Sequence, residues 1–210
     1  QMLSNLCSKT LDLEFFRFRP FGQTLFNLPK RETKSQVHYN AFVKELLEDG
    51  LLTFFQKYSV LGRLMATRLE FWVEATAEFL QRLEDDMSEI QQLFQSELQN
   101  SFRTEEKELS SYNLHIGKVI KIKPALSDSH NQGRNVIALT FESGLKLIYK
   151  PKNLTSEVSY NQFLDWCNQQ GVPLPFKVLQ VLNRGTHGWV EYVERLSCKD
   201  EAAAQRFYQR

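Results

Sequence analysis

The sequence predicts an α+β fold in which a helical N-terminal segment precedes an antiparallel sheet with one packed helix. Apolar residues recur at helical spacing between about residues 39 and 102. The period falls to two after about residue 111, and one helical stretch then interrupts the strands. The 210 residues suffice to bury a core without disulfides, and we divide them into a mainly helical segment, 1–110, and a mixed segment, 111–210.

Composition and charge exclude several classes of protein. Lys and Arg total 26 against 25 Asp and Glu, so the net charge of +1 lacks the basic excess of a nucleic-acid binder. The hydrophobic share of 42% excludes a disordered chain. No window approaches the roughly 18 uninterrupted apolar residues of a transmembrane helix. The first residues show no signal-peptide pattern.

The cysteines are far apart, at Cys7, Cys167 and Cys198. An odd, scattered set is typical of reduced thiols in a cytoplasmic protein, and no Cys or His pair has the spacing of a structural zinc site. The chain does not begin with Met and stops within a predicted helix that starts at residue 200. We therefore expect it to be a piece of a longer protein.

In the first segment, residues 1 to about 37 are predicted to be irregular, with a turn at 19–22 and a solvated loop at 30–35. Helices are expected from residue 39 to residue 102, with an interruption at Asp49-Gly50. Ser88 and Gln91 form a possible capping box that would open a third helix. The longest apolar stripe consists of Leu61, Met65, Leu69, Trp72, Thr76, Leu80 and Leu83. Residues 103–111 are predicted to form a charged linker.

In the second segment, strands are predicted at 119–122, 134–142, 145–150, 177–182 and 188–193. Ser143-Gly144 makes the second and third strands a hairpin, and Pro151 ends the third. Thr155 or Ser156 would then cap a helix that packs on the sheet. The apolar face of that helix is predicted to hold Tyr160, Phe163, Leu164 and Cys167.

Two features of the second segment suggest chemistry. The polar loop 127–134 contains a glycine and lies between two strands, like loops that fold over phosphates. Lys150 shares a strand face with Ile148, so we expect it to start from the interior side of the sheet and to need an acid or an anion. Protein kinases place their phosphate-holding lysine on the third strand, facing an acid from the next helix. An ordinary turn and a surface lysine are the alternatives.

These residues carry a specific resemblance. Residues 127–136, SDSHNQGRNV, and 141–152, FESGLKLIYKPK, strongly resemble the dehydratase domain of class II lanthipeptide synthetases, the LanM-type enzymes. Further matching segments occur in the same order, at 58–64, 79–83, 164–168, 188–194 and 206–210. The resemblance covers about residues 39–210. It implies a lipid-kinase-like fold that uses ATP and magnesium to phosphorylate Ser and Thr of a precursor peptide with a leader segment. Elimination of the phosphate then leaves dehydroamino acids.

The resemblance also implies roles for particular residues. Asp128 and His130 match the family's phosphate-loop acid and histidine, and Lys150 matches its ATP-binding lysine. By analogy with kinase hinges, Glu191, Tyr192 and Val193 would run beside the adenine. Glu157 is the candidate acid opposite Lys150, because it lies in the first turn of the next predicted helix. The family's catalytic and magnesium-binding residues lie beyond Arg210, and its zinc-dependent cyclase domain is absent from this chain. We therefore expect only the nucleotide-binding half of the site, inactive alone. The alternative is a complete, non-catalytic kinase-like binding module.

Overall fold

The computed structural model describes residues 2–19, 31–102, 115–128, 130–195, 197–198 and 200–208. Two compact units are present, residues 1–74 and residues 75–210. The long helix α4, Ser59–Phe102, contributes to both units. This division differs from the sequence-based boundary near residue 110, because the part of α4 after residue 75 packs on the sheet.

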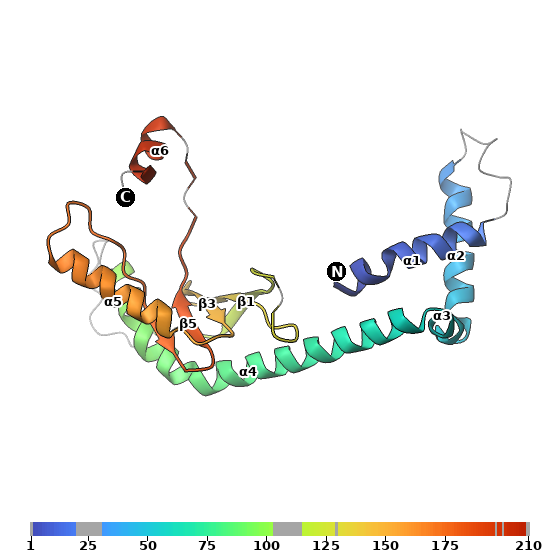
Figure 1. Ribbon diagram of the computed structural model, residues 1–210, viewed down its shortest axis with the longest axis horizontal. Helices are drawn as coiled ribbons and strands as arrows, with labels where there is room; N and C mark the ends of the chain where they lie inside the picture. Colours follow the sequence, from blue (N-terminus) through green and yellow to red (C-terminus); the bar gives the residue numbers. More distant parts are fainter. Residues whose placement is uncertain are drawn as a thin grey trace. The chain divides into compact units, whose positions relative to one another are not determined.

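The first unit is helical. Its elements are α1 Met2–Phe18, α2 Arg31–Glu48, α3 Leu52–Lys57 and the first part of α4 (Figure 1). The interruption at Asp49-Gly50 is confirmed, because α2 ends at Glu48, and Gly50 and Leu51 adopt positive φ angles of 66° and 70°.

The prediction that residues 1 to about 37 are irregular is wrong over α1 and over the start of α2, where the solvated loop was expected. Phe15 of α1 packs edge-on against Tyr39 of α2 and also contacts Phe42. Tertiary packing of this kind stabilises helices whose local signal is weak. Most of the turn expected at 19–22 lies outside the described residues.

A polar contact joins α1 to the end of α3. Glu14 accepts hydrogen bonds from Lys57 Nζ at 2.7 Å, Tyr58 Oη at 2.6 Å and Arg17 Nη1 at 2.8 Å. The hydrogen bond from Lys57, supported by those from Tyr58 and Arg17, lowers the pKa of Glu14 from 4.5 to about 2. The carboxylate therefore stabilises the folded state only when it is ionised.

Replacing Glu14 by Gln is expected to destabilise the chain at neutral pH and to matter less in acid. The folded-state pKa lies below the unfolded one, so the stabilisation is fully present above about pH 4.5 and is lost as the pH falls towards 2. Urea unfolding of wild type and Glu14→Gln at several pH values measures this. A stability difference that stays constant across the acid range would contradict it.

The helix α4 runs without interruption through the position where a third helix was predicted to open, so that prediction is wrong. Ser88 Oγ donates to the neighbouring Glu89 carboxylate at 2.7 Å instead of capping a helix. On the other side of the helix, Ile90 and Phe94 are fully buried. The core contact therefore continues past Ser88 and keeps the helix intact. None of the described helices is long and apolar enough to cross a membrane.

The second unit contains a five-stranded antiparallel sheet; the predicted strands are present, but β4 begins at 181 and not at 177, and β5 ends at 191 and not at 193. Its strands are β1 Val119–Lys123, β2 Ile137–Phe141, β3 Lys146–Lys150, β4 Val181–Asn183 and β5 Gly188–Glu191, in the spatial order β1-β2-β3-β5-β4. The hairpin between β2 and β3 is confirmed. The second strand begins at residue 137 and not 134, because His130 and Arg134 bridge within the preceding loop. The expected linker at 103–111 lies outside the described residues.

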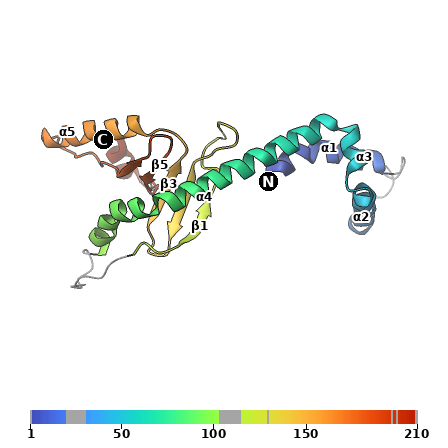
Figure 2. The same cartoon turned by 90° about the horizontal axis from the view of Figure 1, so that it is seen from below.

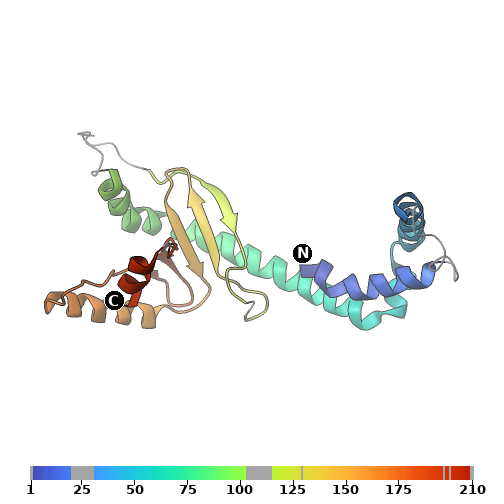
Figure 3. The same ribbon diagram turned by 90° about the horizontal axis from the view of Figure 1, so that it is seen from above.

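The core of this unit lies between one face of the sheet and α4, which crosses the strands (Figures 2 and 3). The central buried side chains are Phe79, Leu83, Ile90 and Phe94 of α4 with Leu139, Phe141, Leu147, Tyr149 and Trp189 of the strands. Because side chains alternate along a strand, Ile148 and Lys150 point to the opposite face. The expectation that Lys150 shares the face of the main core is therefore wrong.

The helix α5, Thr155–Gln169, lies between β3 and β4 in the chain and contacts β4. Its start is fixed by Asn183 of β4, which accepts from the Leu154 amide at 3.1 Å and donates to Thr155 Oγ1 at 3.2 Å. No side chain of Thr155 or Ser156 caps this helix, so that prediction is wrong; Asn153 Oδ1 accepts from the Thr155 amide instead, at 2.7 Å.

The predicted apolar face of α5 is only partly right, since Leu164 and Cys167 are half-buried whereas Tyr160 and Phe163 are exposed. No residue of α5 is fully buried, so α4 and not α5 provides the main cover of the sheet. The final helix α6, Glu201–Tyr208, forms where the sequence predicts it.

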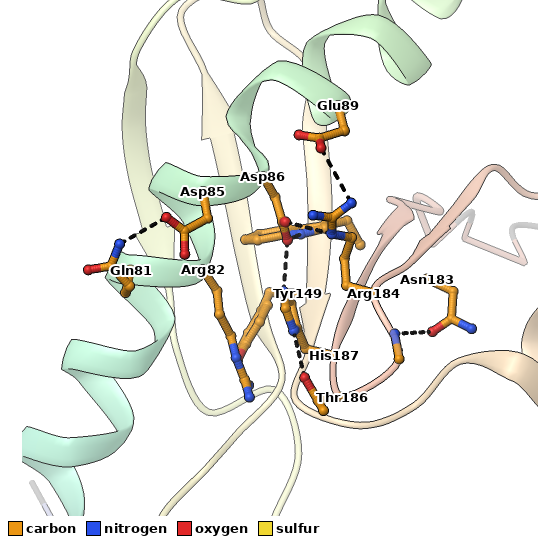
Figure 4. A network of polar contacts seen from close by, with 12 residues as sticks. Gln81, Arg82, Asp85, Asp86, Glu89, Tyr149, Asn183, Arg184, Thr186 and His187 are labelled. Atoms are coloured by element: carbon orange, nitrogen blue, oxygen red, sulfur yellow. Dashed lines mark hydrogen bonds and ion pairs between the residues drawn. The ribbon is translucent and has the colours of Figure 1, made fainter.

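A buried carboxylate ties α4 to the turn between β4 and β5 (Figure 4). Asp86 is 1% exposed and accepts from His187 Nε2 at 2.7 Å, Trp189 Nε1 at 2.7 Å and Arg184 Nε at 2.8 Å. Arg184 also pairs with Glu89 at 3.4 Å. Each buried donor thus has a charged acceptor, which is the condition for burying a carboxylate.

Asp86→Ala is expected to destabilise the chain by about 3 to 5 kcal/mol, because it leaves buried donors and a partly buried guanidinium without their acceptor. The matched control is Asp85→Ala, which removes an exposed carboxylate that accepts from Gln81, and should cost less than about 0.5 kcal/mol. Urea unfolding of the two variants gives the comparison. Equal stabilities would show that Asp86 does not hold the unit together.

Candidate functional site

The structure brings Lys150 and Glu157 together, as predicted. Lys150 is the last residue of β3 and Glu157 lies in the first turn of α5, with Nζ and Oε1 3.6 Å apart. Lys152 approaches the same oxygen more closely, at 2.7 Å. Burial raises the pKa of Glu157, but the hydrogen bond from Lys152 and the charges of both lysines outweigh it, so the pKa lies below its usual value. Glu157 is therefore an ionised carboxylate shared by two ammonium groups.

This cluster carries a surplus of positive charge. Two lysines face one glutamate, and Glu157 Oε2 is buried with no hydrogen-bond partner among the described residues. The side chain of Lys150 is 28% exposed, so its ammonium is partly shielded from water but accessible. Such a lysine can hold an anion, because partial burial strengthens the attraction between charges.

The loop between β1 and β2 carries Asp128 and His130, both exposed. Its tip closes through two backbone hydrogen bonds between His130 and Arg134, at 2.9 and 3.0 Å. Three successive residues at the tip, 131–133, have positive φ angles of 41°, 62° and 92°. Within the described residues no hydrogen bond or ion pair joins Asp128 or His130 to Lys150, so the structure does not itself unite the loop and the lysine.

The loop is anchored to α4 by a contact that the sequence analysis did not find. Arg134 Nε donates to both oxygens of Glu78, at 3.2 and 3.0 Å, and its Nη1 donates to the Asn131 carbonyl at 2.7 Å. The signal available in the sequence was the spacing of Glu78 and Arg82, an acid four residues before a base on one helix. That spacing indicates a helical ion pair, but it does not identify the loop as a partner.

Residues 191–193 lie at the end of β5. Glu191 is paired with Lys177, the Tyr192 amide donates to the Lys146 carbonyl at 3.3 Å, and Val193 is exposed. Because Glu191 pairs with Leu147 in the ladder, it lies three residues along β3 from Lys150, a distance of about 10 Å. The predicted adenine-side and phosphate-side residues therefore belong to adjacent strands.

Side chains of the sheet face opposite α4 lie between Lys150 and residues 191–193. Ala138, Ile148, Val190 and Val181 are successive cross-strand neighbours, and Lys150 is on the same face as Ile148. Ala138, Ile148 and Val181 are half-buried and Val190 is buried, so this face is an apolar row with one cation beside it.

The arrangement brings two ammonium groups to one carboxylate. In the part of the chain that the structure describes, no group of three or more His, Cys, Asp or Glu residues lies close enough to hold a metal ion. The lysines, by contrast, fit an anionic ligand. Of the predicted site residues, Lys150 and Glu157 are in contact. Asp128 and His130 lie on the loop before β2, and residues 191–193 lie at the end of β5.

Comparison with known proteins gives two findings. A family model described as "Domain of unknown function (DUF4135)" matches residues 58–210, most of the chain. A curated relative, "Lacticin 481/lactococcin biosynthesis protein LcnDR2" of Lactococcus lactis subsp. lactis, is 34% identical over 99 residues. That match covers 43% of this chain and 10% of the relative, so the chain spans only a small part of the relative's length. The two findings confirm the resemblance to LanM-type synthetases.

Proposed function

Because this chain belongs to the DUF4135 family, we propose that it forms part of the dehydratase domain of a LanM-type lanthipeptide synthetase. In this proposal the second unit is the upper, nucleotide-binding half of a kinase-like site. The intact enzyme uses ATP to phosphorylate Ser and Thr of a precursor peptide and then eliminates the phosphate.

The observation that carries the proposal is the ion pair between Lys150 at the end of β3 and Glu157 in the first turn of α5. Protein kinases need a pair of this kind, a lysine of the third strand with a glutamate of the following helix, to place the ATP phosphates. Here too the helix follows the third strand, and the sheet is antiparallel throughout. Lys150 matches the family's ATP-binding lysine in sequence, and Glu157 is the partner expected from its place in the first turn of the next helix.

The positions of the other predicted site residues suggest their roles in this proposal. Asp128 and His130 sit on the loop that would cover the phosphates, and the backbone of residues 191–193 would run beside the adenine. The aliphatic face from Ala138 to Val190 would contact the base. Magnesium would neutralise charge that develops on the transferred phosphoryl group. We expect its protein ligands and the catalytic base to come from polypeptide outside these 210 residues.

Lys150→Ala in the intact synthetase is expected to lower the rate of peptide phosphorylation roughly a hundred- to thousandfold, the usual loss when one preorganised electrostatic contact is removed. Folding should be unaffected, because the strand and its core face remain. Phosphorylation is measured by mass spectrometry, with circular dichroism to check the fold.

The matched control for this variant is Lys121→Ala, which removes an exposed lysine of the edge strand β1. It should phosphorylate the peptide at the wild-type rate. Asp128→Ala and His130→Ala should be slower than wild type, because both residues lie on the loop above the phosphates. A wild-type rate in Lys150→Ala would mean that the lysine is a surface residue and that the kinase-like interpretation of the sheet is wrong.

The purified 210-residue chain is expected not to transfer phosphate from ATP. Phosphoryl transfer requires a positioned base and metal ligands as well as a phosphate-holding lysine. The assay is release of labelled phosphate or labelling of a peptide, with the intact synthetase as the positive control. Steady turnover by the chain alone would refute the division of the site that we propose.

A further inference from the structure

The loop and the strand of the proposed nucleotide site are both tied to a single carboxylate, and we infer that Glu78 of α4 is a positioning residue for that site. The inference rests on the proposed function, since it concerns the same loop and the same lysine. Glu78 would touch neither nucleotide nor peptide. It would hold the loop that carries Asp128 and His130, and the strand that carries Lys150, in fixed positions on one helix.

On the loop side, the link is the guanidinium of Arg134. Arg134 bonds Glu78 through Nε at 3.0 and 3.2 Å and through Nη2, a fork that fixes orientation as well as distance. The same guanidinium donates to the Asn131 carbonyl at the tip, and the backbone of Arg134 pairs with that of His130. The tip therefore cannot shift without breaking or moving the contact to Glu78.

On the strand side, the link is Arg82, one helical turn beyond Glu78. Arg82 is paired with Glu78 and donates from Nη1 to Tyr149 Oη at 2.8 Å (Figure 4 shows Arg82 beside Tyr149). Tyr149 is 3% exposed and directly precedes Lys150 in β3. The buried ring holds this end of the strand against α4, and hence sets where the lysine leaves the sheet.

The carboxylate of Glu78 is needed because it lies between two positively charged side chains, Arg82 and Arg134. Glu78 faces two guanidinium groups, and the three side chains are 20% to 25% exposed. The hydrogen bond from Arg134, assisted by the charges of Arg82 and Arg134, lowers the pKa of Glu78 in spite of its burial. A neutral side chain at this position would leave two partly buried cations to repel each other, with the loop no longer fixed.

The test is Glu78→Gln in the intact synthetase, with Glu84→Gln, an exposed acid of the same helix, as the matched control. We expect kcat/KM for ATP to fall roughly tenfold to a hundredfold in Glu78→Gln, because displacing reacting groups by about 1 Å costs that much. The control should match wild type. Amide hydrogen exchange should accelerate across residues 124–136 while the circular dichroism spectrum stays unchanged.

A double variant tests whether Glu78 and Arg134 act through their mutual contact or independently of each other. If Glu78 acts through Arg134, the variant with both Glu78→Gln and Arg134→Met should be no slower than the slower single variant. Additive losses would overturn the inference. So would a loss in Arg134→Met with full activity in Glu78→Gln, since Arg134 would then contact the phosphates itself.

The outcomes also distinguish this inference from the proposed function. Wild-type rates in Lys150→Ala would overturn the proposed function. A slow Lys150→Ala with equal rates in Glu78→Gln and Glu84→Gln would overturn the inference alone. Should Glu78→Gln not fold, Arg134→Lys keeps the charge but loses the fork. Wild-type kinetics in that variant would overturn the inference.

Discussion

The second unit depends on the way one buried carboxylate, Asp86, fixes α4 to the sheet. Three donors from the β4–β5 turn and from β5 converge on it, among them the indole of the fully buried Trp189. Hydrophobic contacts alone would let a long amphipathic helix slide along a sheet. A buried charge with specific hydrogen bonds permits one register only, since any other leaves polar groups unpaired.

Fixing α4 in this way determines which sheet face carries Lys150. The helix occupies the face that carries Leu147, Tyr149 and Trp189, so the face that carries Ile148 and Lys150 is left for other contacts. The lysine then lies three residues along β3, about 10 Å, from the position of Glu191 at the end of β5. The helix α5, held at its start by Asn183, brings Glu157 to the lysine from outside the sheet. Stability and proposed function thus use opposite faces of the same strands.

Part of this arrangement could be predicted from the sequence, because it depends on local patterns. The two-residue turn identified the hairpin between β2 and β3. The first turn of the helix after Pro151 pointed to Glu157 as the partner of Lys150.

Local patterns could not predict the long-range packing. Nothing near Ser88 shows that α4 continues there to cover a sheet, and Glu78 and Arg134 are far apart in the chain. The choice of face for Lys150 failed for the same reason, because alternation defines two faces but not which one a distant helix covers.

The central claim is that the face with Lys150 binds the phosphates of ATP, and a structure of the intact synthetase with magnesium and a non-hydrolysable ATP analogue tests it most directly. Our account predicts the phosphate chain within about 3 Å of Lys150 Nζ, beneath the loop of residues 124–136, with the base over the aliphatic side chains of the same face. A nucleotide bound elsewhere, with Lys150 paired only to Glu157 and open to solvent, would contradict it.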